Sequence, residues 1–66
     1  MSITLAEQCK EIRAYYACTQ ETLAKQVGTT QTEISFIEHG SIPLDPLKIE
    51  NIQRLYKTML TEANKT

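Results

Sequence analysis

Apolar residues recur along the first part of this chain with the period of an α-helix. Leu5, Cys9, Ile12 and Tyr16 are separated by four, three and four positions, which places them on one face of a helix. The pattern predicts an amphipathic helix over about residues 4–17.

Capping signals divide the middle of the chain into two short helices. Thr19 is a suitable N-cap, and Gly28 suits the left-handed residue that ends a helix. Two residues later, Thr30 and Glu33 form the T-x-x-E pattern of a capping box. We therefore expect a helix, a tight turn and a third helix over about residues 31–39, which is the organisation of a helix-turn-helix.

A fourth helix is predicted after a short loop. Gly40 ends the third helix, and Asp45 followed by Pro46 combines a capping carboxylate with proline at the first helical position. We expect this helix over about residues 46–61. The tail, residues 62–66, has no periodicity and is expected to fray.

The apolar face of the fourth helix is wide. Its members are Ile49, Ile52, Leu55, Tyr56, Met59 and Leu60. At 100° per residue they cover an arc of about 140°, compared with about 100° for a helix that faces one core. We expect part of this arc to contact a second copy of the chain, with Leu55 and Met59 as candidate homodimer contacts.

Composition supports a single all-α domain over residues 1–66, built as a compact bundle of four or five helices. The 66 residues are 41% hydrophobic and 23% charged and include only two glycines.

So short a chain has little room for a large enclosed active site. Ser35 and His39 lie four positions apart, but no orienting acid or oxyanion pocket accompanies them, so we expect no catalytic residues and no enzymatic activity. Cys9 and Cys18 lack a metal-ligand spacing with the single histidine, and we expect no metal and no cofactor.

Charge and hydropathy narrow the possible partners. The net charge of −1 disfavours indiscriminate phosphate binding but leaves selective DNA binding open. No apolar run approaches the roughly 20 residues that span a bilayer, so we expect no membrane partner. The start Met-Ser-Ile-Thr-Leu lacks a basic segment and a cleavable apolar stretch, which favours a cytoplasmic protein.

The outer side of the predicted third helix is polar and uncharged. If Ile34 and Ile37 point inward, the opposite side carries Gln31, Thr32, Ser35, Phe36 and His39. Glutamine can bond adenine, hydroxyls can donate or accept, and an exposed phenylalanine can press on a thymine methyl group. We expect Gln31, Thr32, Ser35 and Phe36 to contact bases.

Four segments carry a resemblance to a known family: Ile12-Arg13, Thr19-Gln20-Glu21-Thr22-Leu23-Ala24, Val27-Gly28-Thr29-Thr30-Gln31 and I-x-x-I-E-x-G at 34–40. Together they resemble the phage repressor and Cro type helix-turn-helix family of XRE-like regulators. The resemblance covers about residues 12–40. It implies a lambda-repressor-like bundle with helix 31–39 in the major groove, and a homodimer on an inverted-repeat operator. It also implies a regulator of transcription, here expected to be a repressor, without catalytic chemistry.

The resemblance assigns further roles residue by residue. Gln31, Thr32 and Phe36 match positions that meet base edges, and Gln20 matches a side chain that braces Gln31 and touches phosphate. Thr19 and His39 match positions that contact the DNA backbone. Arg13 and Glu38 match a partly buried ion pair that ties the first helix to the end of the third.

One departure from the family favours a second function. Residues 26–47 contain no Lys or Arg, whereas family members place basic residues just after the motif. The DNA phosphates must then be held by backbone amides, by Thr19, Gln20 and His39, and by Lys10 or Lys25. The alternative is a protein-interaction module, antitoxin-like or an anti-repressor subunit, in which Phe36, Ile42 and Leu44 dock onto a protein partner.

Overall fold

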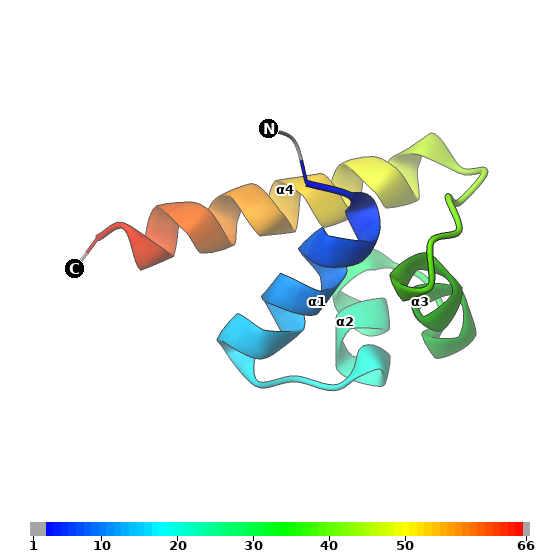
Figure 1. The fold of residues 1–66 in the computed structure, drawn as a ribbon, viewed down its shortest axis with the longest axis horizontal. Coiled ribbons are helices and arrows are strands. Elements are labelled where there is room, and N and C mark those ends of the chain that lie inside the picture. The colour runs from blue at the N-terminus through cyan, green and yellow to red at the C-terminus, as the bar shows by residue number, and fades with distance from the viewer. Residues whose placement is uncertain (1–2, 66) are drawn as a thin grey trace.

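In the computed structural model, which describes residues 3–65, the chain is all-α (Figure 1). The helices are α1 (Leu5–Tyr16), α2 (Gln20–Val27), α3 (Gln31–Glu38) and α4 (Pro46–Ala63). This confirms the predicted fold class, with four helices in the described residues. The long α4 packs mainly against α1, and its C-terminal half extends away from α2 and α3 (Figure 1).

Every helix begins with a side-chain cap. Oxygen atoms of the cap residues accept a hydrogen bond from a backbone N–H in the first turn, at 3.0–3.2 Å. The caps are Thr4, Thr19, Thr30 and Asp45. The three caps that the sequence predicted are therefore confirmed, because these short side chains satisfy amides that no helical carbonyl reaches.

Left-handed residues follow the first three helices. Gly28 (φ 79°) and Gly40 (φ 109°) take the predicted conformation, and the Ser41 N–H donates to the Phe36 carbonyl at 2.9 Å as in a Schellman motif. α3 ends at Glu38, one residue before the predicted end. Ala17 (φ 52°) follows α1 in the same conformation although it has a side chain.

α4 continues two residues beyond its predicted end. The expectation that residues 62–66 fray is wrong for Glu62 and Ala63, which are helical. The Tyr16 hydroxyl of α1 donates to the Glu62 carboxylate at 3.0 Å, so a contact between distant segments supports the last turn. Thr66 lies outside the described residues.

The hydrophobic core is formed by the apolar faces of all four helices. Its buried members are Leu5, Cys9, Ile12, Leu23, Ala24, Val27, Ile34, Ile37, Ile52 and Met59. Met59 is only 5% exposed. This corrects its role as a candidate dimer contact, because a side chain packed in its own core has little surface for a second copy. Leu55 packs at the edge of the core and stays partly exposed.

Among residues 3–65, no helix is both long and apolar enough to cross a membrane.

Candidate nucleic-acid interface

A three-residue turn, Gly28–Thr30, connects α2 to α3. The Thr29 N–H donates to the Ala24 carbonyl at 2.9 Å, and the Asn51 side chain of α4 donates to the Val27 carbonyl at 3.1 Å. The end of α2 is thus held from two sides. Its packing against α3 then fixes which side of α3 faces the solvent.

The inner side of α3 is fully packed, and its outer side is open. Ile34 and Ile37 are buried as expected, which leaves the outer face, defined as Gln31, Thr32, Ser35 and Phe36, toward solvent. These four residues and Gln20 line a shallow depression of about 360 Å³, the polar hollow. The structure therefore brings all four predicted base-contacting residues together. Phe36 is 59% exposed, as the sequence predicted.

The polar side chains of the outer face are available for contacts with other molecules. Within the described part of the chain, Gln31, Thr32 and Ser35 make no side-chain hydrogen bond. Their amide and hydroxyl groups remain available to water or to a ligand.

Gln20 lies beside the outer face but binds elsewhere. Its Nε2 donates to Oε1 of Glu38 at 3.2 Å. This differs from the expectation that Gln20 braces Gln31. The buried carboxylate of Glu38 is a stronger acceptor than a neutral amide, which explains the choice.

Arg13 and Glu38 form the predicted ion pair. One guanidinium nitrogen of Arg13 donates to both carboxylate oxygens of Glu38, at 2.8 and 3.0 Å. Arg13 Nε also donates to the Cys18 carbonyl at 3.4 Å. Glu38 is buried, so the pair joins α1 to the end of α3 with little solvent around the carboxylate.

A second ion pair lies at the start of α3. The Glu33 backbone N–H donates to the Thr30 hydroxyl, which confirms one half of the predicted capping box. The other half, from the Thr30 N–H to the Glu33 carboxylate, is not formed in the described residues, because that carboxylate binds other partners. The Glu33 carboxylate is 2.9 Å from Lys48 Nζ of α4 and also accepts from the Thr29 hydroxyl. The hydrogen bond from Lys48, together with that from Thr29, lowers the pKa of Glu33. The same bond to Glu33 raises the pKa of Lys48. Sequence reasoning missed this pair, because nothing local links α3 to the first turn of α4.

Both acidic residues of α3 are consequently paired with cations. Glu38 is balanced by Arg13 and Glu33 by Lys48. Because the outer face has no charged residue of its own, α3 offers a neutral surface to a partner. A polyanion would meet no unpaired carboxylate there.

The predicted phosphate-contacting residues lie around α2 and α3. Thr19 is exposed, and its hydroxyl caps α2 while donating to Thr22 at 3.1 Å. Lys25 is exposed and lies 3.8 Å from Glu21. His39 is exposed, and its Nδ1 donates to the Ser35 carbonyl at 2.7 Å, which leaves Nε2 for an outside partner.

Phe36 also borders an apolar hollow on its other side. This depression of about 170 Å³ is lined by Glu33, Phe36, Ile37, Ser41, Ile42, Pro43 and Leu44. Ile42 is 64% exposed and Leu44 is fully exposed. The ring of Phe36 thus separates a polar surface from an apolar one.

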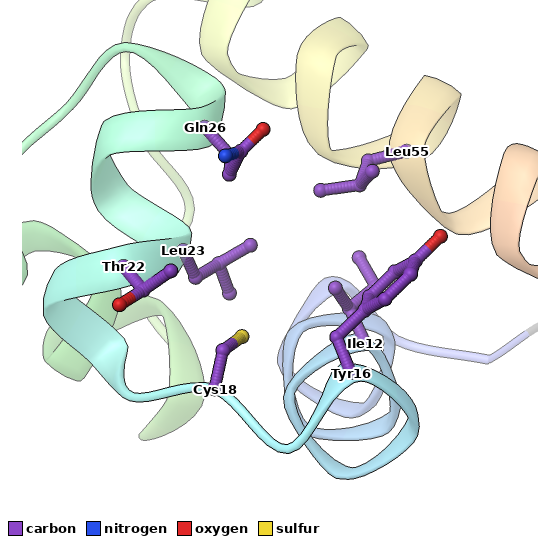
Figure 2. A pocket seen from close by; sticks show the side chains of 7 residues that line it. All are labelled: Ile12, Tyr16, Cys18, Thr22, Leu23, Gln26 and Leu55. Atoms are coloured by element: carbon purple, nitrogen blue, oxygen red, sulfur yellow. The ribbon is translucent and has the colours of Figure 1, made fainter.

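A third depression, the three-helix groove, lies between α1, α2 and α4 (Figure 2). It has a volume of about 290 Å³ and is lined by Ile12, Tyr16, Cys18, Thr22, Leu23, Gln26 and Leu55. Figure 2 shows Leu23 and Leu55 extending into it from facing helices. The candidate dimer residue Leu55 therefore belongs to this groove.

Comparison of the chain with protein-family models, with curated proteins and with solved structures finds no match. Within residues 3–65, no three His, Cys, Asp or Glu side chains gather in a way that could hold a metal ion. Cys9 and Cys18 are both free thiols.

Proposed function

We propose that this chain is a sequence-specific DNA-binding regulator of transcription, a cytoplasmic repressor of the phage repressor and Cro type that places α3 in the major groove. The observation that carries the proposal is the outer face of α3, which presents unpartnered hydrogen-bonding groups and an exposed aromatic ring on a neutral surface. The eight residues of α3 give a length of about 12 Å, comparable to the width of the major groove.

Phosphate binding then relies on few cations. On the side of α2 and α3 the exposed candidates are Lys25, Thr19 and His39, with Lys10 on α1. If a dimer uses Lys10 and Lys25 from each protomer, four phosphates are neutralised, and log affinity falls with log salt with a slope of about −4. A much steeper slope would show that other cations hold the DNA.

The proposed operator is an inverted repeat bound by a homodimer. Two recognition helices related by a two-fold axis require half-site centres about 10 to 10.5 base pairs apart. The three-helix groove with Leu55 is the remaining candidate for the dimer contact. Sedimentation that shows only monomer with and without DNA, or a selection that yields asymmetric sites, would contradict this arrangement.

Selection of binding sites from random duplex DNA, followed by gel shifts with variants, tests the function. Gln31→Ala should lose about 1 to 3 kcal/mol of binding on the selected site and relax selectivity at one base pair per half-site. Gln53→Ala, which removes an exposed glutamine of α4 away from the outer face and from the three-helix groove, is the matched control and should bind like wild type. Undiminished selective binding by Gln31→Ala together with Phe36→Ala would refute the assignment of α3.

A second candidate function rests on the apolar hollow. Ile42 and Leu44 are strongly exposed next to Phe36, as expected for a protein-interaction module of the antitoxin or anti-repressor kind. In that case Phe36, Ile42 and Leu44 form a hot spot for a protein partner, and Gln31→Ala is nearly neutral. For a DNA-binding protein the pattern inverts: Ile42→Ala and Leu44→Ala leave DNA affinity almost unchanged.

A further inference from the structure

We infer that the outer face of α3 selects A·T base pairs, with a thymine methyl group against the ring of Phe36 and an adenine bonded by Gln31. The inference rests on the proposed function and specifies the class of operator that this face recognises.

The first step concerns what the outer face lacks. In the major groove guanine presents two acceptors, for which Arg and Lys are the preferred partners, and cytosine presents a donor that suits Asp and Glu. The polar hollow contains none of these residue types. The nearby charged groups are already engaged, because Arg13 binds Glu38 and Lys48 binds Glu33. The surface therefore has no ionic partner for a G·C pair.

The second step concerns the amide groups. Adenine presents an acceptor and a donor that one glutamine amide can bond together. Gln31 is exposed and has no partner within residues 3–65. The Nε2 of Gln20 is committed to Glu38. Gln31 is thus the amide in the polar hollow whose donor and acceptor are both available for adenine.

The third step concerns Phe36. Its ring is 59% exposed and stands at the edge of the polar hollow. A ring pressed on the polar edge of guanine or cytosine would bury donors or acceptors without partners, which is costly. The thymine methyl group is the apolar surface that the major groove offers, so thymine is the base that Phe36 favours.

Base analogues test the inference on the wild-type protein. In the selected operator, each dT is replaced in turn by dU, which lacks the methyl group, and affinity is measured by fluorescence anisotropy. One position per half-site should lose about fourfold in affinity, the value of one buried methyl group. That loss should disappear in Phe36→Ala. Leu44→Ala removes an apolar side chain that is even more exposed but lies outside the polar hollow, and this variant should keep the loss.

A second analogue tests Gln31. Replacing the contacted adenine by 7-deazaadenine removes the acceptor that the amide bonds. Wild type and the control Gln53→Ala should lose affinity for this site, and Gln31→Ala should bind modified and unmodified sites equally. Circular dichroism checks that each variant is folded.

The outcomes separate the two proposals. Selected half-sites dominated by G·C pairs, or wild-type affinity unchanged by dU at every position, would overturn the inference while DNA binding stands. Absence of any sequence-selective DNA binding would overturn the proposed function as well. A·T-rich half-sites with a dU effect that depends on Phe36 would support both.

Discussion

Removing Arg13 from the Arg13–Glu38 pair should destabilise the protein much more than removing Glu38. The Glu38 side chain is 6% exposed and that of Arg13 is 31% exposed. In Arg13→Ala the buried carboxylate keeps only the hydrogen bond from Gln20. In Glu38→Ala the guanidinium can turn toward water and still reach the Cys18 carbonyl.

The expected magnitudes follow from this asymmetry. Arg13→Ala leaves an unpaired buried charge and should cost about 3 kcal/mol or more. Glu38→Ala should cost about 1 to 2 kcal/mol, because its partner is rehydrated. At about 0.05 to 0.15 kcal/mol per residue, a chain of 66 residues has a total stability of about 3 to 10 kcal/mol. Arg13→Ala is therefore expected to lower Tm by about 12 °C or more.

Thermal and urea melts followed by circular dichroism measure both effects. The matched control is Arg54→Ala, which removes an arginine that is also 2.8 Å from a glutamate, Glu50, in a pair whose two side chains are exposed. Its cost should stay below about 0.5 kcal/mol. The double variant of Arg13 and Glu38 to alanine should lose less than the sum of the single changes. If each single change lowers the stability by only a few tenths of a kcal/mol, the pair is exposed to solvent and the reasoning is refuted.

Three further predictions concern other parts of the chain. Ala17→Gly should stabilise the protein by about 0.5 to 1 kcal/mol in melts, because relief of the left-handed strain exceeds the extra unfolded-state entropy of glycine; a lower Tm would contradict it. Cys18 should react with iodoacetamide at pH 8 well before Cys9, because Cys9 is buried and burial raises its pKa to about 11. Equal alkylation rates of the two thiols, measured by mass spectrometry, would argue against the burial of Cys9 in the core. The bond from Lys48 lowers the pKa of Glu33, so this pair contributes stability above the ordinary pKa of 4.5 and loses it as pH falls through the lowered value. The stability difference between wild type and Glu33→Gln should therefore vanish on acidification, and a difference that persists at pH 2 would exclude this origin.

Short-range signals in the sequence predicted most of the fold. Thr19, Thr30 and Asp45 mark helix starts because a cap bonds an amide only two or three positions away. Gly28 and Gly40 mark helix ends because they adopt positive φ without strain. These features depend on residues that are close together in the chain, so they can be predicted from the sequence alone.

Interactions between segments that are distant in the chain could not be predicted as well from the sequence. The width of an apolar arc does not say how α4 crosses α1, and Met59 consequently lies in the core rather than on the surface. The last turn of α4 depends on Tyr16 and Glu62, which are 46 positions apart. No local signal marks Ala17 as a left-handed residue. The Arg13–Glu38 pair was anticipated only through a family resemblance.

The two ion pairs of α3 connect the stability of this helix with its surface charge. A helix of eight residues has little stability by itself, so both its formation and its orientation depend on contacts with the rest of the protein. Lys48 of α4 holds the start of α3 through Glu33, and Arg13 of α1 holds its end through Glu38. The same two contacts remove the negative charge that would otherwise stand beside the outer face. A partner that carries phosphate groups would therefore meet an α3 that is both fixed in position and electrically neutral, and the loss of either cation would disturb both properties together.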